Sequence, residues 1–367
     1  MITLKGMTWD HPRGYDPLAA LSQEWEAARG VRITWDRRSL QDFESYPVLD
    51  LAKAYDLIII DHPHVGQITQ EGCLVPLPEA PEIAAGSLGH SFESYTWDGQ
   101  QWAWPVDAAA QVQAVRPDLC APVADWDAVM RLAAEGRVMI PLRPPHVLMS
   151  FYTLCANLGH PCRVTRDAPF VDRAGGRDAL ALLRDLAQRV DPACYEMDPI
   201  EVLAHMAQSD RIACAPLIYG YISYALPGAK PHRVTFHDIP EAAPGAGPKG
   251  SALGGTGLAV SAFGQHPEAA IAFARHAAGP EAQAGLWASA GGQAGHRDAW
   301  TSAEVDAGAG SFYSGTLATL DAAWMRPRHD GYMPFQQAAS ERLNAALKDG
   351  AFEAAMDDLD QLFAETF

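Results

Sequence analysis

The sequence predicts an α/β protein built as two lobes with a ligand cleft between them, and three observations lead to this prediction. The chain has 367 residues, more than the roughly 250–300 residues over which one hydrophobic core keeps growing. Its first 61 residues read as strand, helix, strand, helix and strand, the order typical of an open α/β sheet. A strand with one polar face, at residues 107–114, then precedes a second block of alternating elements.

The first block is delimited by local signals. Asp16-Pro17 is typical of a capped helix start and Gly30 of a helix end. The apolar run at 56–61 predicts a strand buried on both faces. The expected elements are a strand at 1–7, a helix at 16–30, a strand at 31–35, a helix at 47–54 and a strand at 56–61.

The stretch from Trp97 to Pro117 is the one around which we organise the rest of the chain. Asp107, Gln111 and Gln113 fall on one side of an alternating pattern, and alanines and valine fall on the other. Asp and Gln set among alanines leave room for a ligand to approach and be hydrogen-bonded. We interpret the stretch as a strand that leaves one lobe, lines the cleft and enters the second lobe. An ordinary edge strand is the alternative.

The second block repeats the alternation and returns to the first lobe. The glycines of 254–257 supply the backbone freedom that a hinge needs, so they predict a crossing back. A third crossing is expected at 324–328. The other expected elements are helices at 125–136, 149–158, 180–190, 198 onward, 266–277, 334–347 and 352–363, and strands at 138–140 and 211–215.

Composition and missing motifs exclude several classes of function. A formal charge of -18 disfavours nucleic acid, and no apolar run approaches the ~18 residues of a membrane span. The sequence has no Gly-x-Ser-x-Gly, Walker or His-Glu-x-x-His motif. Residues 245–250 match a dinucleotide fingerprint formally, but Pro248 and the absence of a surrounding βαβ unit argue against it.

The cysteines and the first residues bear on the compartment. None of the six cysteines forms a Cys-x-x-Cys motif, and most are expected to be small buried side chains. Cys155 and Cys162 are close enough in sequence to pair in an oxidising compartment. Residues 1–7 read as a strand and have none of the features of an export signal. Either a signal has been trimmed, or the chain begins here and its compartment is open to question.

Several segments together resemble the extracellular solute-binding proteins of family 1, the group that includes maltose-binding protein and serves ABC importers of sugars. The similarity lies in residues 102–105, 122–126, 212–220, 254–260 and 280–283. The resemblance implies the two-lobed periplasmic-binding-protein fold, a ligand cleft between lobes, and closure around the ligand. The lobes are expected at 1–111 with 258–310 and at 112–257 with 311–367, with crossings near 108–116, 254–260 and 300–328.

The expected function is capture of a carbohydrate or polyol and its delivery to the permease subunits of an ABC transporter, by a periplasmic monomer without enzymatic activity, metal or cofactor. Polar groups would bind the sugar hydroxyls and aromatic rings would stack on its apolar faces. Ligands of open α/β sheets lie beyond the carboxyl ends of the strands, which selects the loops after the first and third strands. The candidate ligand-binding residues are Trp9, Asp10, His11, Asp61, His62, Asp107, Gln111, Arg143, Tyr219, Tyr221, Gly254, Gly255 and Arg326.

Four alternatives are open at this stage. The solute could be anionic or zwitterionic, because basic side chains collect in loops: His11, Arg13, His62, His64, Arg143, His146, His296, Arg326 and Arg328. His62 and His64 with Asp61 could bind a metal, although Pro63 and the lack of a further acid weaken this idea. The protein could be a carbohydrate-active hydrolase or lyase. It could also deliver its solute to a sensor, and the sequence cannot separate a sensor from a transporter.

Overall fold

The chain divides into two compact units. The computed structural model describes residues 1–39, 47–167 and 169–367. Unit 1 comprises Met1–Ala109, Gly254–Gly308 and Arg328–Asp330, and unit 2 comprises Ala110–Leu253, Ala309–Pro327 and Gly331–Phe367. The chain therefore passes from one unit to the other inside strands β6 (Trp104–Val115) and β9 (Leu253–Val260), and again in its last third.

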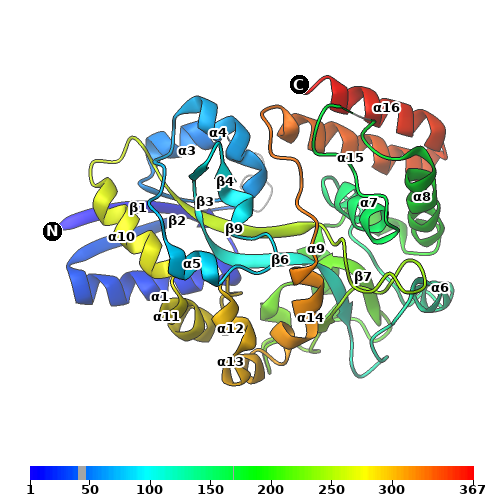
Figure 1. Cartoon of the computed structure of the whole chain (residues 1–367). Helices are drawn as coiled ribbons and strands as arrows, with labels where there is room; N and C mark the ends of the chain where they lie inside the picture. The colour runs from blue at the N-terminus through cyan, green and yellow to red at the C-terminus, as the bar shows by residue number, and fades with distance from the viewer. Residues whose placement is uncertain (40–46, 168) are drawn as a thin grey trace. The chain divides into compact units, whose positions relative to one another are not determined.

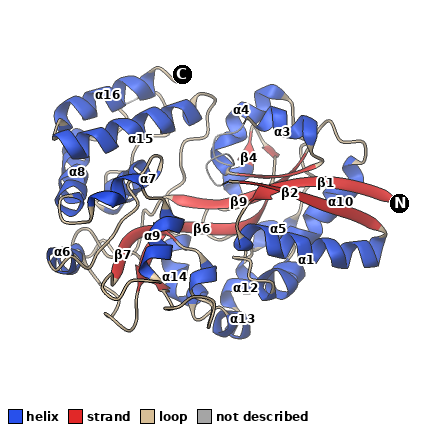
Figure 2. Ribbon diagram, turned by 180° about the vertical axis from the view of Figure 1, so that it is seen from behind, coloured by secondary structure: helices blue, strands red, loops and turns tan. Residues whose placement is uncertain are grey.

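Unit 1 contains a mixed sheet with helices on both sides. Its strands follow the order β2-β1-β3-β9-β6, in which β1 pairs in parallel with β2 and β3, and β3 pairs antiparallel with β9. Helices α3 and α4 lie on one side of this sheet, and α1 and α10 lie on the other (Figures 1 and 2). The elements are β1 (Ile2–Trp9), α1 (Pro12–Arg29), β2 (Val31–Arg38), α3 (Val48–Ala54), β3 (Leu57–Ile60), α4 (Val65–Glu71), α5 (Pro81–Ala85), β4 (Thr96–Trp97), β5 (Gln100–Gln101), α10 (Pro267–Ala278), α11 (Pro280–Ala282), a π-helical turn (Gln283–Trp287), α12 (Arg297–Thr301) and α13 (Ala303–Gly308).

The start of α1 differs from the prediction. The helix begins at Pro12 rather than at Asp16, because His11 acts as the N-cap and its Nδ1 accepts a hydrogen bond from the Arg13 amide at 3.1 Å. Pro17 therefore lies inside the helix. The predicted end at Gly30 is confirmed, since its φ of 67° is the left-handed conformation of a C-terminal glycine. The buried strand predicted at 56–61 is also confirmed as β3, whose four residues are all buried.

Unit 2 is built around the second half of β6, which pairs antiparallel with β7 and with β8. Helices α7, α8, α15 and α16 gather into one cluster (Figure 2), and the rings of Phe170, Phe335 and Phe363 contact one another inside it. The remaining elements are α6 (Trp126–Ala134), α7 (His146–Asn157), α8 (Arg173–Ala187), α9 (Pro199–Met206), β7 (Cys214–Tyr219), β8 (Thr235–His237), α14 (Phe312–Asp321), α15 (Tyr332–Asp349) and α16 (Phe352–Ala364).

Two strands predicted in unit 2 require correction. The strand expected at 211–215 is β7, at Cys214–Tyr219, because the Ser209 hydroxyl accepts from the amides of Arg211 and Ile212 and holds them in a turn. The strand expected at 138–140 is a single bridge between Val138 and Cys214. The amide of Met139 bonds to β7 and that of Leu142 bonds elsewhere, to Cys194, so no ladder continues.

Strand β6 is wholly interior. All of its residues are buried, including Asp107, Gln111 and Gln113, and it lies between β9 and β7 in the strand order. The edge-strand alternative is therefore wrong. In the part of the chain that the structure describes, no helix is both long enough and apolar enough to cross a membrane.

Candidate functional site

A buried ion pair anchors the candidate residues of unit 1. The guanidinium of Arg13, at the start of α1, donates to both carboxylate oxygens of Asp107 on β6, with 2.6 Å between Nε and Oδ2 and a second bond from Nη2 to Oδ1. Arg13 is 5% and Asp107 is 1% exposed. Burial raises the pKa of the Asp107 carboxyl and the Arg13 guanidinium opposes that shift. The room expected beside Asp107 is thus occupied by Arg13.

The loop after β1 is fixed by short-range contacts. Trp9 is buried, and a Cβ on Gly14 would lie 2.6 Å from its indole ring, so the glycine lets Trp9 pack against the first turn of α1. Asp10 is exposed and pairs with Arg37 at 3.1 Å. His11 caps α1, as described above. These contacts fix the three predicted residues at the start of α1, in the same turn as Arg13.

The loop after β3 forms the second group in unit 1. Asp61 caps a 3-10 turn at His62–His64 by accepting from the His62 amide at 2.9 Å. His62 is fully buried and meets Tyr95 edge to face, with 6.3 Å between ring centroids. The Tyr95 hydroxyl lies 3.3 Å from the Ile60 carbonyl and 3.4 Å from the Gly255 carbonyl. Tyr95 thereby links this loop to β9.

Gly255 on β9 must be glycine for two reasons. Its φ is 95°, and a Cβ there would lie 2.4 Å from the Asp107 carbonyl oxygen and 2.9 Å from the Ala108 Cα. The backbones of β9 and β6 therefore approach closely beside Asp107, and Gly254 directly precedes this point. The structure thus brings the unit 1 candidates together around the ends of β1 and β3 and this contact of β6 with β9.

In unit 2, Gln111 joins β6 to α7. Its Nε2 donates to Ser150 Oγ at 3.1 Å and its Oε1 accepts from Thr153 Oγ1 at 2.7 Å. The Gln111 carbonyl also accepts from Ser251 Oγ at 2.6 Å. Gln111 is fully buried, so its amide holds the strand to the helix within unit 2.

Arg143 lies on the N-terminal cap of α9. It donates to Asp198 Oδ2 at 2.5 Å and to Glu201 Oε2 at 3.0 Å. Asp198 and Glu201 form the capping box of that helix. Arg143 is therefore neutralised by carboxylates of unit 2 while its side chain stays about one-third exposed (32%).

Tyr219 and His146 meet at the end of β7. Tyr219 pairs with Gln111 across the strands, and its ring contacts that of His146 with 6.5 Å between centroids. His146 is 4% exposed. Burial lowers the pKa of the His146 imidazole to about 4, so the ring is neutral at pH 7. Tyr221, two residues after Tyr219, is buried at the start of a 3-10 turn.

Arg326 is held by a polar network in unit 2. Its Nη1 donates to Gln336 Oε1 at 3.0 Å, and the same oxygen accepts from the Tyr332 hydroxyl at 3.1 Å. The hydroxyls of Tyr332 and Tyr152 are 3.4 Å apart. Besides burial, the charge of Asp198 raises the pKa of His146, and the charges of Arg143 and Arg326 lower it. These four side chains therefore lie near one another.

Two basic residues considered at the sequence level have structural roles within unit 1. His296 caps α12 through Nδ1, and its Nε2 lies 3.0 Å from the Glu82 carbonyl. Arg328 donates to three backbone carbonyls, those of Glu93, Ser94 and Thr96. Both contacts fix neighbouring segments of the chain. Among residues 1–39, 47–167 and 169–367 no cluster of three or more His, Cys, Asp or Glu side chains could hold a metal ion.

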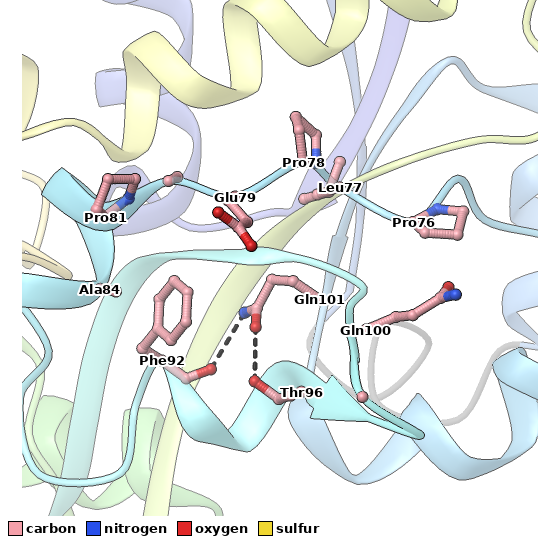
Figure 3. Close-up of a pocket in the computed structure, with 12 residues that line it drawn as sticks. Pro76, Leu77, Pro78, Glu79, Pro81, Ala84, Phe92, Thr96, Gln100 and Gln101 are labelled. Atoms are coloured by element: carbon pink, nitrogen blue, oxygen red, sulfur yellow. Dashed lines mark hydrogen bonds between the residues drawn. The ribbon is translucent and has the colours of Figure 1, made fainter.

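Two cavities, one within each unit, are lined by none of the predicted site residues. The cavity in unit 1 has a volume of about 600 Å³ (Figure 3) and that in unit 2 about 410 Å³. In the first, the Gln101 amide donates to the Phe92 carbonyl at 3.1 Å and accepts from Thr96 Oγ1 at 2.6 Å. Its lining comprises Pro76, Leu77, Pro78, Glu79, Ala80, Pro81, Ala84, Phe92, Thr96, Gly99, Gln100 and Gln101.

The structure adds side chains that the sequence did not place in the candidate set. Arg13 and His146 entered only as basic residues in predicted loops, without a role in binding the ligand. Tyr95 carried no sequence signal, because its contacts join residues far apart in the chain. Gln336 carried none either, although its partners Arg326 and Tyr332 are close to it in sequence. The position of Arg13 within the loop predicted after the first strand is the signal that could have identified it.

Comparisons with known proteins extend over the whole chain. The family model described as bacterial extracellular solute-binding protein matches residues 20–309. No curated protein sequence matches the chain significantly.

Three solved structures illustrate the likeness. The ribitol complex of an ABC transporter solute-binding protein from Agrobacterium radiobacter K84 is 18% identical, with a TM-score of 0.81 and coverage of 100% of this chain and 99% of that chain. The α-D-tagatose complex of such a protein from Thermotoga lettingae TMO is 17% identical, with a TM-score of 0.82 and full coverage of both chains. The maltose-bound MalE3 of T. maritima is 16% identical, with a TM-score of 0.84 and 98% coverage of both chains. At these identities the likeness establishes the fold, and it confirms the predicted fold class.

Proposed function

Because the chain belongs to the bacterial extracellular solute-binding protein family, we propose that it captures a carbohydrate or polyol and delivers it to an ABC importer. The observation that carries this proposal is the match, over essentially the full length of the chain, to proteins solved with ribitol, α-D-tagatose and maltose. The protein acts outside the cytoplasm, in the periplasm, as a monomer that presents its solute to the transporter permease subunits. It binds the solute without converting it.

The internal pairing of the arginines favours a neutral, hydroxyl-rich solute. Arg13 is ion-paired with Asp107, and Arg143 with Asp198 and Glu201. Arg328 is engaged by backbone carbonyls. The partners of these guanidinium groups orient their N–H donors and compensate much of their charge. Such groups are better suited to donating hydrogen bonds to the hydroxyl groups of a solute than to pairing with a carboxylate of the solute.

We propose that residues of both units bind the solute. Unit 1 contributes the loop residues Trp9, Asp10, His11, Asp61 and His62, together with Asp107, Gly254 and Gly255. Unit 2 contributes Gln111, Arg143, Tyr219, Tyr221 and Arg326. To these we add Arg13, oriented by Asp107, and His146, whose neutral imidazole can exchange hydrogen bonds with hydroxyl groups. Aromatic rings in this set can stack on the apolar faces of a sugar.

A ligand screen tests the proposal. Because binding to the native state raises its stability by mass action, we expect one or more neutral sugars or polyols to raise the Tm, and isothermal titration to give one site per chain. Sugar acids, sulfonates and quaternary amines of similar size are the comparison ligands. A Tm increase confined to the anionic or cationic compounds would contradict a neutral solute, and sustained product formation would contradict a binding protein.

A further inference from the structure

Two buried thiols lie close together at the end of α7 in unit 2. Cys155 is in the last turn of the helix and is 0% exposed, and Cys162 follows the helix and is 4% exposed. Burial, and then a hydrogen bond with the Cys155 thiol, raise the pKa of Cys162 well above its usual range. The two sulfur atoms are therefore neighbours inside the core.

The backbone between these cysteines explains how they meet. Gly159 has a φ of 91°, its amide donates to the Ala156 carbonyl at 3.1 Å, and the His160 amide donates to the Cys155 carbonyl at 2.8 Å. This is the left-handed turn that ends many helices and reverses the chain over the last helical turn. Cys162 follows the reversed segment and so returns to the side of Cys155.

The other cysteines make different contacts. The Cys73 thiol donates to the Ile68 carbonyl and the Cys120 thiol to the Ala213 carbonyl. Burial, and then the charge of Cys120, raise the pKa of the Cys214 thiol, so these two side chains also lie near each other. In Cys120, however, the thiol proton points to a backbone oxygen rather than to another sulfur. The pair at the end of α7 is the better placed for a covalent bond.

We infer that Cys155 and Cys162 form an intramolecular disulfide when the protein folds in an oxidising compartment. The extracellular family supplies that setting, because disulfides form and persist outside the cytoplasm. One thiolate attacks the disulfide of an oxidant, such as oxidised glutathione or a dithiol oxidoreductase, and releases one reduced thiol. The second thiolate attacks the mixed disulfide and releases the other. Overall, two cysteine thiols lose two protons and two electrons, and the oxidant disulfide gains them.

The bond would tie α7 to the segment that packs on α16. After Cys162, the Arg163 amide donates to the Phe170 carbonyl at 2.7 Å, and the Phe170 amide donates to Asp360 on α16 at 2.9 Å. The Phe170 ring contacts Phe363 of the same helix. A covalent link between Cys155 and Cys162 would close a short loop in the unfolded chain. In the folded chain it would fix to α7 the start of the segment that contacts α16.

The test is to unfold the purified protein, refold it with a mixture of reduced and oxidised glutathione, and map the bonds by mass spectrometry after alkylation in denaturant. We expect one disulfide joining Cys155 to Cys162 and alkylation of the other four thiols, which are the six cysteines minus the bonded pair. Alkylation of all six, or a bond joining Cys120 to Cys214, would overturn the inference. The mapping uses the unsubstituted chain, so it does not depend on a variant folding.

Thermal unfolding supplies the matched control. Because the bond closes only a short loop, its reduction should lower the Tm of the oxidised protein by about 5 °C. The same reductant should leave the Cys155→Ala/Cys162→Ala variant unchanged and should lower the Tm of Cys120→Ala/Cys214→Ala as in the unsubstituted protein. Neither readout involves the solute, so failure here leaves the proposed function standing, and failure to find a solute leaves the disulfide standing.

Discussion

The two units bury an arginine to the same extent but stabilise it with different chemistry. Arg13 in unit 1 and Arg326 in unit 2 are each 5% exposed. Arg13 donates two hydrogen bonds to the carboxylate of Asp107. Arg326 donates to the neutral amide oxygen of Gln336, which also accepts from a tyrosine hydroxyl.

This difference decides what each unit loses when a partner is changed. Removing one member of a buried ion pair leaves an uncompensated charge, whereas removing a neutral partner leaves an unmade hydrogen bond. The position of Arg13 is therefore tied to the carboxylate of Asp107, and that of Arg326 to a neutral network that includes Gln336 and Tyr332. Three sets of substitutions, at Asp107, His146 and Gln336, test the comparison.

The largest effect is expected at the ion pair of unit 1. Asp107→Ala leaves the Arg13 guanidinium buried without its carboxylate and should lower the free energy of unfolding by about 3–5 kcal/mol. Urea denaturation followed by tryptophan fluorescence measures this. Glu353→Gln, which removes an exposed partner of Arg177, is the control and should cost less than about 1 kcal/mol. The double variant Arg13→Met/Asp107→Leu should recover much of the loss, and its failure to do so would show that packing, not charge, dominates at this position.

The next effect concerns the pH dependence contributed by unit 2. The pKa of His146 is lowered from 6.5 to about 4 in the folded state, so the unfolded chain binds a proton more readily between these values. The neutral His146 therefore contributes up to about 3 kcal/mol to the free energy of unfolding. This contribution is fully present above pH 6.5 and is lost as the pH falls toward 4.

The measurement for His146 is the free energy of unfolding at pH 7 and at pH 4.5 for the unsubstituted protein and for His146→Gln. The variant lacks the titrating group, so it should lose less stability over this interval than the unsubstituted protein. Equal losses in the two proteins would rule out His146 as the source of the acid sensitivity.

The smallest effect is expected at the neutral network. Gln336→Leu removes the acceptor of Arg326 and Tyr332 and should cost about 1–3 kcal/mol. Gln336→Glu places a carboxylate where the amide oxygen stood, which imitates the arrangement of unit 1, and should cost less than the leucine substitution. A larger loss for glutamate than for leucine would mean that the charge of Arg326 is already balanced, and the contrast between the units would then fail.

The elements that could be predicted are those set by local hydrogen bonds. Helices α6 and α9 begin directly after Asp125 and Asp198, where the sequence predicted helix starts, and each aspartate caps its helix by accepting from the amide three residues on. The errors occur where contacts distant in sequence decide. The peptide groups around Val138 bond to β7 and Cys194, so they form no continuous strand. His11 takes over as the cap of α1 from the Asp16 that the local pattern favoured.

The candidate site shows the same limit. The alternation along β6 correctly placed Asp107 and Gln111 as polar residues on one strand, but it could not supply their partners. Arg13 lies 94 residues from Asp107 in sequence, and Thr153 lies 42 residues from Gln111. Side chains of the protein itself thus occupy the room that the small neighbouring alanines leave.

The place of β9 in the sheet has a consequence for biosynthesis. This strand lies between β3 and β6, although it follows both of them in sequence by more than a hundred residues. During synthesis, β3 and β6 therefore lack the strand that joins them until residue 260 has been added. Long-range pairing of this kind is slow. The sheet of unit 1 is therefore expected to be completed only after more than two thirds of the chain has been synthesised.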